Sequence, residues 1–202
     1  MKVLLIGGGG YIGNVVAEGL LQNKYKVSIL DNFIYDHKKT ISNLINFKNF
    51  ELIEGDITNL NFVKSKVKNY DCVVLLAGLV GDPITKKYPE LSSKINDIGI
   101  KNAVDVSFEN NIKKLIFVST CSNYGLIKNN DLADENYPLA PISLYAKSKV
   151  KAEKYIMNHK NRNINTSATI LRFATAFGIS NRMRFDLTVN EFVKDLEQKK
   201  EL

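Results

Sequence analysis

The sequence predicts an α/β protein with a doubly wound parallel sheet, and three observations support this fold class. The chain opens with a short apolar run, a glycine turn and the first turn of a helix, MKVLLIGGGGYIGN. Segments typical of strands and of helices then alternate, which indicates parallel strands covered by helices on both faces. Residues 72–76, CVVLL, are apolar throughout, as expected of a central strand buried on both sides.

Six strands are predicted, each a short run rich in apolar or β-branched residues. In chain order they cover residues 3–6, 27–30, 50–54, 72–76, 115–119 and 166–172. Helices are expected over residues 92–110 and 145–159. Residues 129–141 contain two prolines among acidic and amide side chains, which predicts a loop.

The glycine turn after the first strand predicts a binding site for the pyrophosphate of a dinucleotide. Gly7, Gly10 and Gly13 follow the strand at intervals of three, although Gly8, Gly10 and Gly13 fit G-x-G-x-x-G equally well. A residue without Cβ lets phosphates approach the main chain, and the first N–H groups of the helix attract negative charge. Tyr11 and Ile12 lie within this site. The alternative is a flexible glycine turn with no ligand.

Asp31 ends the second predicted strand, within the roughly 20 residues at which a ribose-binding acid is expected. A carboxylate there accepts hydrogen bonds from the adenosine ribose and repels a 2′-phosphate. The sequence therefore predicts NAD, not NADP, with Asn32 beside the same ribose. Alternatively, Asp31 is an ordinary turn residue.

A candidate catalytic set follows the fifth strand. That strand ends at Thr120, and Tyr145 and Lys149 come later at a spacing of four, which puts both on one face of a helix. A tyrosine with a pKa near 10 is a poor base at neutral pH, whereas a neighbouring ammonium favours the phenolate. Tyr145 could then take a proton from a sugar hydroxyl while the carbon gives hydride to NAD⁺, with Thr120 bonded to the reacting oxygen. Tyr35 and Tyr124 also precede a lysine by four positions, without a suitable strand and helix around them.

Composition narrows the classes of protein further. The 202 residues carry a net charge of +7, but the lysines are scattered, so nucleic-acid binding is not expected. No apolar run approaches the roughly 18 residues of a membrane span, and the first one is too short for a signal peptide. The two cysteines, Cys72 and Cys121, lack the spacing of a metal site. We expect a cytoplasmic protein without a metal.

Taken together, these segments resemble the extended short-chain dehydrogenases/reductases, specifically the NAD-dependent epimerase/dehydratase family. The resemblance spans nearly the whole chain and rests on motifs that occur in the family's order, namely GGGGYIG, LDNF, GDIT, LLAGLVGDP, Asn96, STCSNYG, YAKSK and LRFATAFG. It implies a Rossmann-like NAD-binding domain over residues 1–175 and only the start of a smaller substrate domain over residues 176–202. It also implies nucleotide-diphosphate sugars as substrates.

The resemblance assigns ligands to individual positions. Asp56 and Ile57 would flank the adenine, residues 77–79 the middle of the cofactor, and Lys149 the nicotinamide ribose. The complete expected cofactor set is Gly7, Gly10, Tyr11, Ile12, Gly13, Asp31, Asn32, Asp56, Ile57, Ala77, Gly78, Leu79, Asn96, Tyr145 and Lys149. A homodimer would form through the helices at residues 92–110 and 145–159.

Departures from the family pattern refine the predicted reaction. Dehydratases carry Asp-Glu where this chain has Cys121-Ser122, and neither residue readily supplies the strong acid and base that loss of water needs. We therefore expect a nucleotide-sugar 4-epimerase or C4 oxidoreductase that forms a 4-keto sugar in surface polysaccharide synthesis. The expected substrate contacts are Thr120, Cys121, Ser122, Thr175, Arg182 and Arg184, and the two arginines could clamp a diphosphate.

Chain length leaves three alternatives open. Similar proteins usually continue well beyond this length and build most of the sugar pocket from the additional residues. The three are a fragment of a full enzyme, an enzyme whose missing half is supplied by a separate C-terminal chain, and a non-catalytic NAD-binding remnant.

Overall fold

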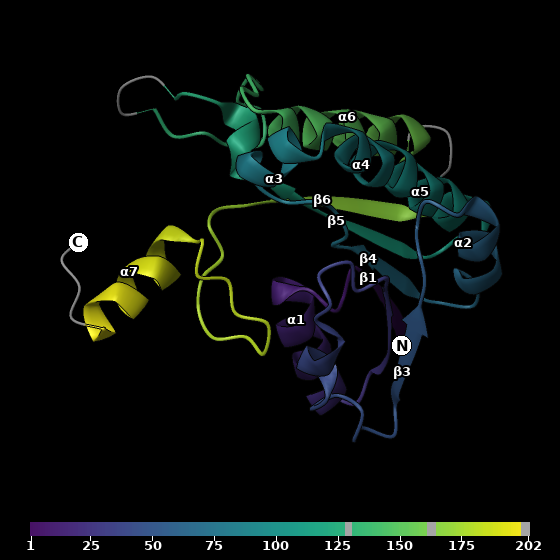
Figure 1. The fold of residues 1–202 in the computed structure, drawn as a ribbon. Coiled ribbons are helices and arrows are strands. Elements are labelled where there is room, and N and C mark those ends of the chain that lie inside the picture. The colour runs from purple at the N-terminus through teal and green to yellow at the C-terminus, as the bar shows by residue number, and fades with distance from the viewer. Residues whose placement is uncertain (128–130, 161–164, 199–202) are drawn as a thin grey trace.

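A computed structural model describes residues 1–127, 131–160 and 165–198 of the chain. Its centre is one six-stranded sheet with the strand order β3-β2-β1-β4-β5-β6 (Figure 1). Every neighbouring pair is parallel. The order reverses between β1 and β4, which creates the crevice at the carboxyl ends of the strands where doubly wound folds bind ligands. The predicted fold class is confirmed.

All six predicted strands are present. They are β1 (Lys2–Ile6), β2 (Lys26–Asp31), β3 (Phe50–Glu54), β4 (Cys72–Leu75), β5 (Lys114–Thr120) and β6 (Ser167–Phe173). The α-helices are α1 (Tyr11–Gln22), α2 (Leu60–Lys66), α3 (Asp82–Lys87), α4 (Pro89–Ser93), α5 (Ile100–Glu109), α6 (Leu144–Lys160) and α7 (Thr188–Glu197). None of the helices in the described part of the chain is long and apolar enough to cross a membrane.

Alternating side chains of the strands build one hydrophobic cluster on each face of the sheet. Val3 and Leu5 of β1 point to the face covered by α1, where they pack with Ala17 and Leu21. Leu4 and Ile6 belong to the cluster on the opposite face, beneath α2, α5 and α6 (Figure 1). Successive residues of a strand face opposite sides, so an apolar run becomes buried on both sides.

The helix predicted over residues 92–110 is longer and less regular than expected. It begins at Pro89, widens into a π-helical segment at Lys94–Gly99 and continues as α5. Two contacts accompany the wide turn. Asn96 bonds to the backbone of Leu79, and Gly99 lies so close to Ile57 that an added Cβ would be 2.6 Å from Ile57 Cγ1. An interrupted helix of this kind is common next to functional sites, and apolar periodicity does not reveal it.

The chain after β6 leaves the sheet, passes the start of α1 and ends in α7, which projects away from the sheet (Figure 1). Tyr11 anchors this segment, since its hydroxyl donates to Gly178 O at 2.6 Å and accepts from Asn190 Nδ2 at 3.0 Å. Ser180 Oγ donates to Tyr11 O at 2.8 Å. The predicted substrate segment therefore starts beside the glycine turn. Its residues 199–202, and residues 129 and 130 of the predicted loop, lie outside the described residues.

The close packing of α1 on the glycine turn can be tested with two substitutions in one helix. An added Cβ at Gly13 would be 2.5 Å from Gly8 Cα, whereas at Gly19 it would have no atom within 4 Å. We expect Gly13→Ala to lower the free energy of unfolding by about 1–3 kcal/mol, as overpacking does. Gly19→Ala should raise it by about 0.5–1 kcal/mol, because alanine favours the helix. Urea denaturation of both variants measures this, and equal effects would contradict the proposed contact.

Candidate cofactor and active site

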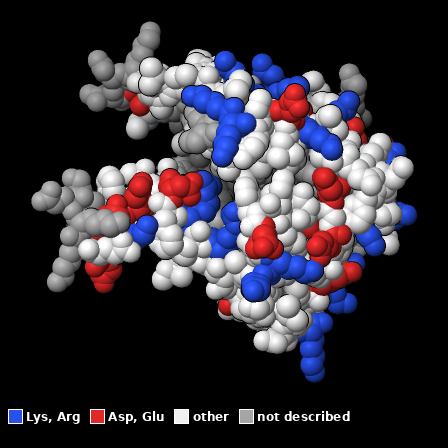
Figure 2. Space-filling model, viewed as in Figure 1, with Lys and Arg blue, Asp and Glu red and all other residues white. Residues whose placement is uncertain are grey.

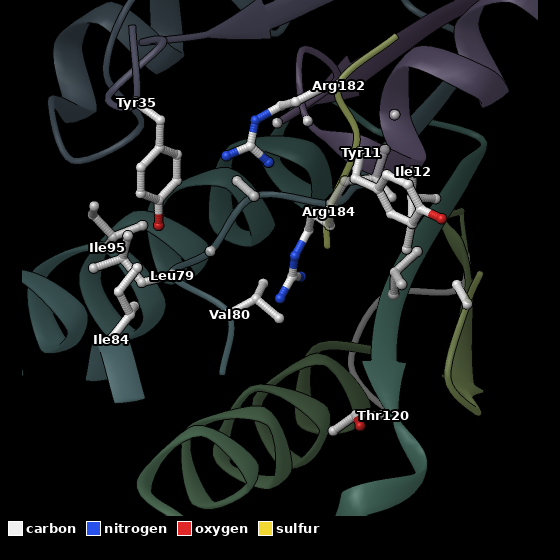
Figure 3. Close-up of a pocket in the computed structure, with 18 of the residues that line it drawn as sticks. Tyr11, Ile12, Tyr35, Leu79, Val80, Ile84, Ile95, Thr120, Arg182 and Arg184 are labelled. Atoms are coloured by element: carbon white, nitrogen blue, oxygen red, sulfur yellow. The ribbon is translucent and has the colours of Figure 1, made fainter. Parts of the chain in front are cut away.

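A cavity of about 610 Å³ lies at the carboxyl ends of the strands. The segments that follow all six strands contribute to its wall, and so do residues 182–187 of the C-terminal segment. Figure 3 shows Arg182 and Arg184 of this segment among the lining side chains. Figure 2 shows a notch in the surface where α7 projects, with basic side chains at its base. All the predicted site residues except Asn96 line this cavity.

The glycine turn has the geometry that an anion needs. Gly7 has a φ of +81°, and an added Cβ there would be 2.4 Å from Ala77 N. Gly10 precedes α1 without a side-chain cap on the helix, so the first N–H groups of α1 are open to a ligand. Gly8 lies beneath the turn against Ile29 and is not part of the cavity wall. The structure therefore favours the register of Gly7, Gly10 and Gly13.

Asp31 has a structural role that the sequence did not reveal. One carboxylate oxygen accepts from Gly9 N at 2.9 Å and the other from Phe33 N at 2.8 Å. These bonds hold the glycine turn and the loop after β2 together at the cavity wall. Each oxygen keeps a further lone pair for the ribose hydroxyls expected there.

Asp56, Ile57 and residues 77–79 also line the cavity. Asn96 is buried behind them, and this differs from its predicted contact with the cofactor. Its Oδ1 accepts from Leu79 N at 2.8 Å, and its Nδ2 donates to Leu79 O at 3.0 Å. Because these bonds engage both ends of its amide, Asn96 positions the loop after β4 and is no part of the cavity wall.

Thr120, Tyr145 and Lys149 face the same cavity, but Lys149 is not bonded to the phenol. Its Nζ donates to Val118 O at 2.8 Å and lies 5.8 Å from the centroid of the Tyr145 ring. The Tyr145 hydroxyl has no hydrogen-bond partner among the described residues and is available to a ligand. The ammonium thus lies over the Tyr145 ring, on the shared helix face, without a hydrogen bond to the hydroxyl.

Burial dominates the electrostatics of this pair. It raises the pKa of Tyr145 to about 12, an effect that the charge of Arg184 opposes. Burial also lowers the pKa of Lys149 to about 8, against the attraction of Glu153. The phenol is therefore protonated at neutral pH in the protein without ligand. The cation that counters its burial is Arg184, which differs from the expected Lys149.

The predicted substrate residues divide into two groups. Thr120, Cys121 and Ser122 follow β5, where Thr120 Oγ1 accepts from Ser122 N at 3.1 Å. Thr175 and the arginines come from the segment after β6. The two arginines have different partners, because Arg184 forms a two-pronged pair with Asp186 whereas the guanidinium of Arg182 lies 4.9 Å from the Tyr35 ring centroid (Figure 3).

Close to the predicted catalytic residues is a buried ion pair that the sequence did not predict. Glu153 of α6 accepts from Arg172 Nη2 at 2.8 Å and from Ser119 Oγ at 2.6 Å. Asn123 Nδ2 donates to the same carboxylate at 2.7 Å. Glu153 follows Lys149 by four positions and therefore shares its helix face, which is the signal that could have identified it. The network joins α6 to β5 and β6 below Tyr145 and Thr120.

Comparison with known proteins places the chain among enzymes of one family. The family model described as the NAD dependent epimerase/dehydratase family matches residues 3–201. The chain belongs to this family. It is 30% identical to the UDP-glucose 4-epimerase of Lactobacillus helveticus, over 89% of this chain and 53% of that protein. It is also 30% identical to the N-acetyl-α-D-glucosaminyl-diphospho-undecaprenol 4-epimerase of Escherichia coli O157:H7, over 90% of this chain and 50% of that protein.

A solved structure of the family supports the same assignment. The UDP-glucuronic acid 4-epimerase of Bacillus cereus, in complex with UDP-glucuronic acid and NAD, has a TM-score of 0.88 at 26% identity. The match covers 100% of this chain and 65% of that one. The chain spans about half the length of the curated relatives it matches. The family resemblance found in the sequence is confirmed.

The buried ion pair predicts a large stability effect. Arg172→Met would leave the Glu153 carboxylate without its counter-ion, and we expect the free energy of unfolding to fall by about 3–5 kcal/mol. Arg184→Met is the matched control, because its partner Asp186 is largely exposed and the pair should contribute less than about 1 kcal/mol. The double variant with Glu153→Gln should recover part of the loss. A double variant no more stable than Arg172→Met alone would contradict this account.

Lys149 should make stability depend on pH. Its pKa falls from 10.5 to about 8 on folding, so between these pH values the unfolded chain holds more protons than the folded protein. The contribution of Lys149 to the free energy of unfolding therefore rises with pH across this window, by about 3 kcal/mol. Urea denaturation from pH 7.5 to 10.5 should show that the free energy of unfolding of wild type increases relative to that of Lys149→Met. A constant difference between the two proteins would refute the lowered pKa.

Proposed function

We propose that this protein is an NAD-dependent nucleotide-sugar epimerase that acts through a 4-keto sugar, with C4 oxidoreduction as the closely related outcome. The observation that carries the proposal is the position of three side chains. Thr120, Tyr145 and Lys149 face the same cavity as the glycine turn and Asp31. A proton acceptor and a dinucleotide site thus share one enclosed space.

The residues at the cavity wall fit NAD. The uncapped start of α1 suits the pyrophosphate, and the free lone pairs of Asp31 suit the adenosine ribose. Lys149 can exchange its bond to Val118 O for hydroxyls of the nicotinamide ribose. When bound, NAD would supply the acceptor for the hydride that leaves the sugar carbon.

In the proposed reaction, Tyr145 moves the proton and Thr120 orients the sugar. The Tyr145 phenolate takes the proton of the C4 hydroxyl while the C4 hydride leaves, and the C4–O bond becomes a ketone. Thr120 Oγ1 donates to the reacting oxygen. Arg184 favours the charged phenolate, because its charge opposes the effect of burial on the Tyr145 hydroxyl. Return of hydride and proton to the opposite face of the ketone completes epimerisation with no net oxidation.

The side chains after β5 favour epimerisation over loss of water. Cys121 and Ser122 are exposed at the cavity and provide no carboxylate beside Thr120. The relatives named above are 4-epimerases, and their substrates carry the sugar on a diphosphate. These observations support a diphosphate-linked hexose as substrate, with Thr175 and Arg184 among its contacts. A role in surface polysaccharide synthesis in the cytoplasm, by a homodimer paired through α5 and α6, completes the proposal.

An exposed apolar surface favours a second candidate function, namely that of an NAD-binding protein that is catalytically incomplete without further polypeptide. Phe177, Ile179, Phe192, Val193 and Leu196 are all at least half exposed, and most of them line a second cavity beside α7. Contiguous apolar surface of this kind usually contacts other protein. We propose that further substrate-domain polypeptide covers it, either on the same chain or on a separate one. Without that polypeptide, the protein would bind NAD and turn over no sugar.

The test is turnover of UDP-, GDP- and dTDP-hexoses by the purified protein with NAD. A C4 epimer detected by NMR supports the epimerase, and NADH absorbance near 340 nm with a released ketose supports oxidation. Tyr145→Phe should reduce turnover at least about 10²-fold, because it removes the proton acceptor, and should leave NAD affinity within about twofold. Tyr155→Phe is the matched control on the same helix, since its hydroxyl bonds to Asp105 and is not part of the cavity wall.

Each result decides between the candidates. NAD binding with no turnover of any sugar favours the non-catalytic or incomplete protein. Full activity of Tyr145→Phe would refute the assigned acid-base residue. Equal losses in Tyr145→Phe and Tyr155→Phe would show that the effect comes from α6 as a whole.

A further inference from the structure

Arg182 is held against the part of the cavity where the glycine turn lies. Its backbone N–H donates to Ser180 Oγ at 3.3 Å, and that hydroxyl donates to Tyr11 O at 2.8 Å. Tyr11 is the first residue of α1. Two short contacts thus tie the backbone of Arg182 to the helix end that offers free N–H groups.

On its other side, the guanidinium stacks on Tyr35. The ring centroid is 4.9 Å from Arg182 Cζ, and Tyr35 comes from the loop that follows β2 and Asp31. In Figure 3 the guanidinium of Arg182 lies next to the Tyr35 ring. Stacking on an aromatic ring holds the planar group in one orientation and leaves its edge N–H groups available.

The guanidinium has no hydrogen-bond acceptor within the described part of the chain. Arg184 differs, because Asp186 accepts from its Nε and Nη2. Burial lowers the pKa of Arg182, and so does the neighbouring charge of Arg184, whereas Tyr35 and Asp31 oppose this shift. The five N–H donors of this half-buried cation thus have no partner among the described residues, and an anion in the cavity could accept from them.

We infer that Arg182 binds the pyrophosphate diester of the bound dinucleotide, together with the first N–H groups of α1. The inference rests on the proposed NAD binding and divides the two arginines between the ligands. Arg182 lies beside Tyr11 and Tyr35, on the cofactor side. Arg184 acts electrostatically on Tyr145 as well as on Tyr35, whereas Arg182 does not act on Tyr145, and we therefore assign Arg184 to the substrate side. The alternative source of the same chemistry is the diphosphate of the sugar substrate.

A 2′-phosphate is a poor alternative ligand for Arg182. The Asp31 carboxylate lies at the same cavity wall and would repel that group. A pyrophosphate carries its charge one ribose away from Asp31, next to the start of α1. The bidentate edge of a guanidinium suits two phosphate oxygens.

The experiment compares Arg182→Gln with the matched control Arg184→Gln on the full 202-residue chain. Dissociation constants for NAD, ADP-ribose, NADP and UDP are measured by calorimetry at 50 and 300 mM salt. We expect Arg182→Gln to weaken the binding of NAD and of ADP-ribose at least about tenfold. Binding should also become less dependent on salt, since one charged contact is lost. Arg184→Gln should leave the dissociation constants for NAD and ADP-ribose within about twofold of the wild-type values. In the absence of ligand, neither variant should change the melting temperature.

The outcomes separate this inference from the proposed function. Failure of wild type to bind NAD or ADP-ribose refutes both. Wild-type binding of NAD that Arg182→Gln leaves unchanged refutes only the role of Arg182. If Arg182→Gln loses affinity for UDP alone, Arg182 contacts the substrate. If wild type binds NADP more tightly than NAD, Arg182 contacts a 2′-phosphate. A loss of NAD affinity with unchanged salt dependence, or with a lowered melting temperature, would show a structural role only.

Discussion

The site depends on two places where backbone approaches backbone without side chains between. At Gly13, helix α1 rests on Gly8, and at Gly7 the turn passes Ala77 at the end of β4. A Cβ at either glycine would lie 2.5 Å or less from main-chain atoms. Only this contact lets α1 begin at the switch point of the sheet with its N–H groups directed into the cavity. Every other ligand contact is arranged around that helix end.

The opposite side of the cavity is supported by charge. Glu153 and Arg172 join α6 to the last two strands, and Ser119 and Asn123 occupy the remaining positions on the carboxylate. A buried pair of this kind adds little net stability over apolar residues, but it fixes one arrangement of the elements it connects. Here it sets the position of the helix that carries Tyr145 and Lys149. Packing on one wall and ion pairing on the other thus define the same space.

The sequence was sufficient for the sheet and for most of the cavity wall, because both follow from local signals. Apolar runs identify parallel strands. The turn after β1 needs glycine for its backbone dihedral angles, and the ribose site needs a negative charge at the end of β2, where Asp31 stands. The failures concern long-range contacts. Asn96 bonds to Leu79, 17 residues away, and Arg172 pairs with Glu153 across a helix and a strand. The bond from Lys149 to Val118 O likewise depends on where β5 and α6 meet. Short helices such as α2 and α3 have too few turns to show a period.

The position of Tyr11 has a thermodynamic consequence. One phenol fastens the segment of Gly178 and Asn190 to the helix end proposed to hold the coenzyme phosphates. A ligand that tightens the start of α1 also restrains the cavity wall formed by the segment after β6, and the coupling is reciprocal by linkage. If NAD and a nucleotide sugar bind as proposed, the first ligand lowers the conformational entropy that the second must still remove. The proposed reaction would then be ordered, with the dinucleotide bound first.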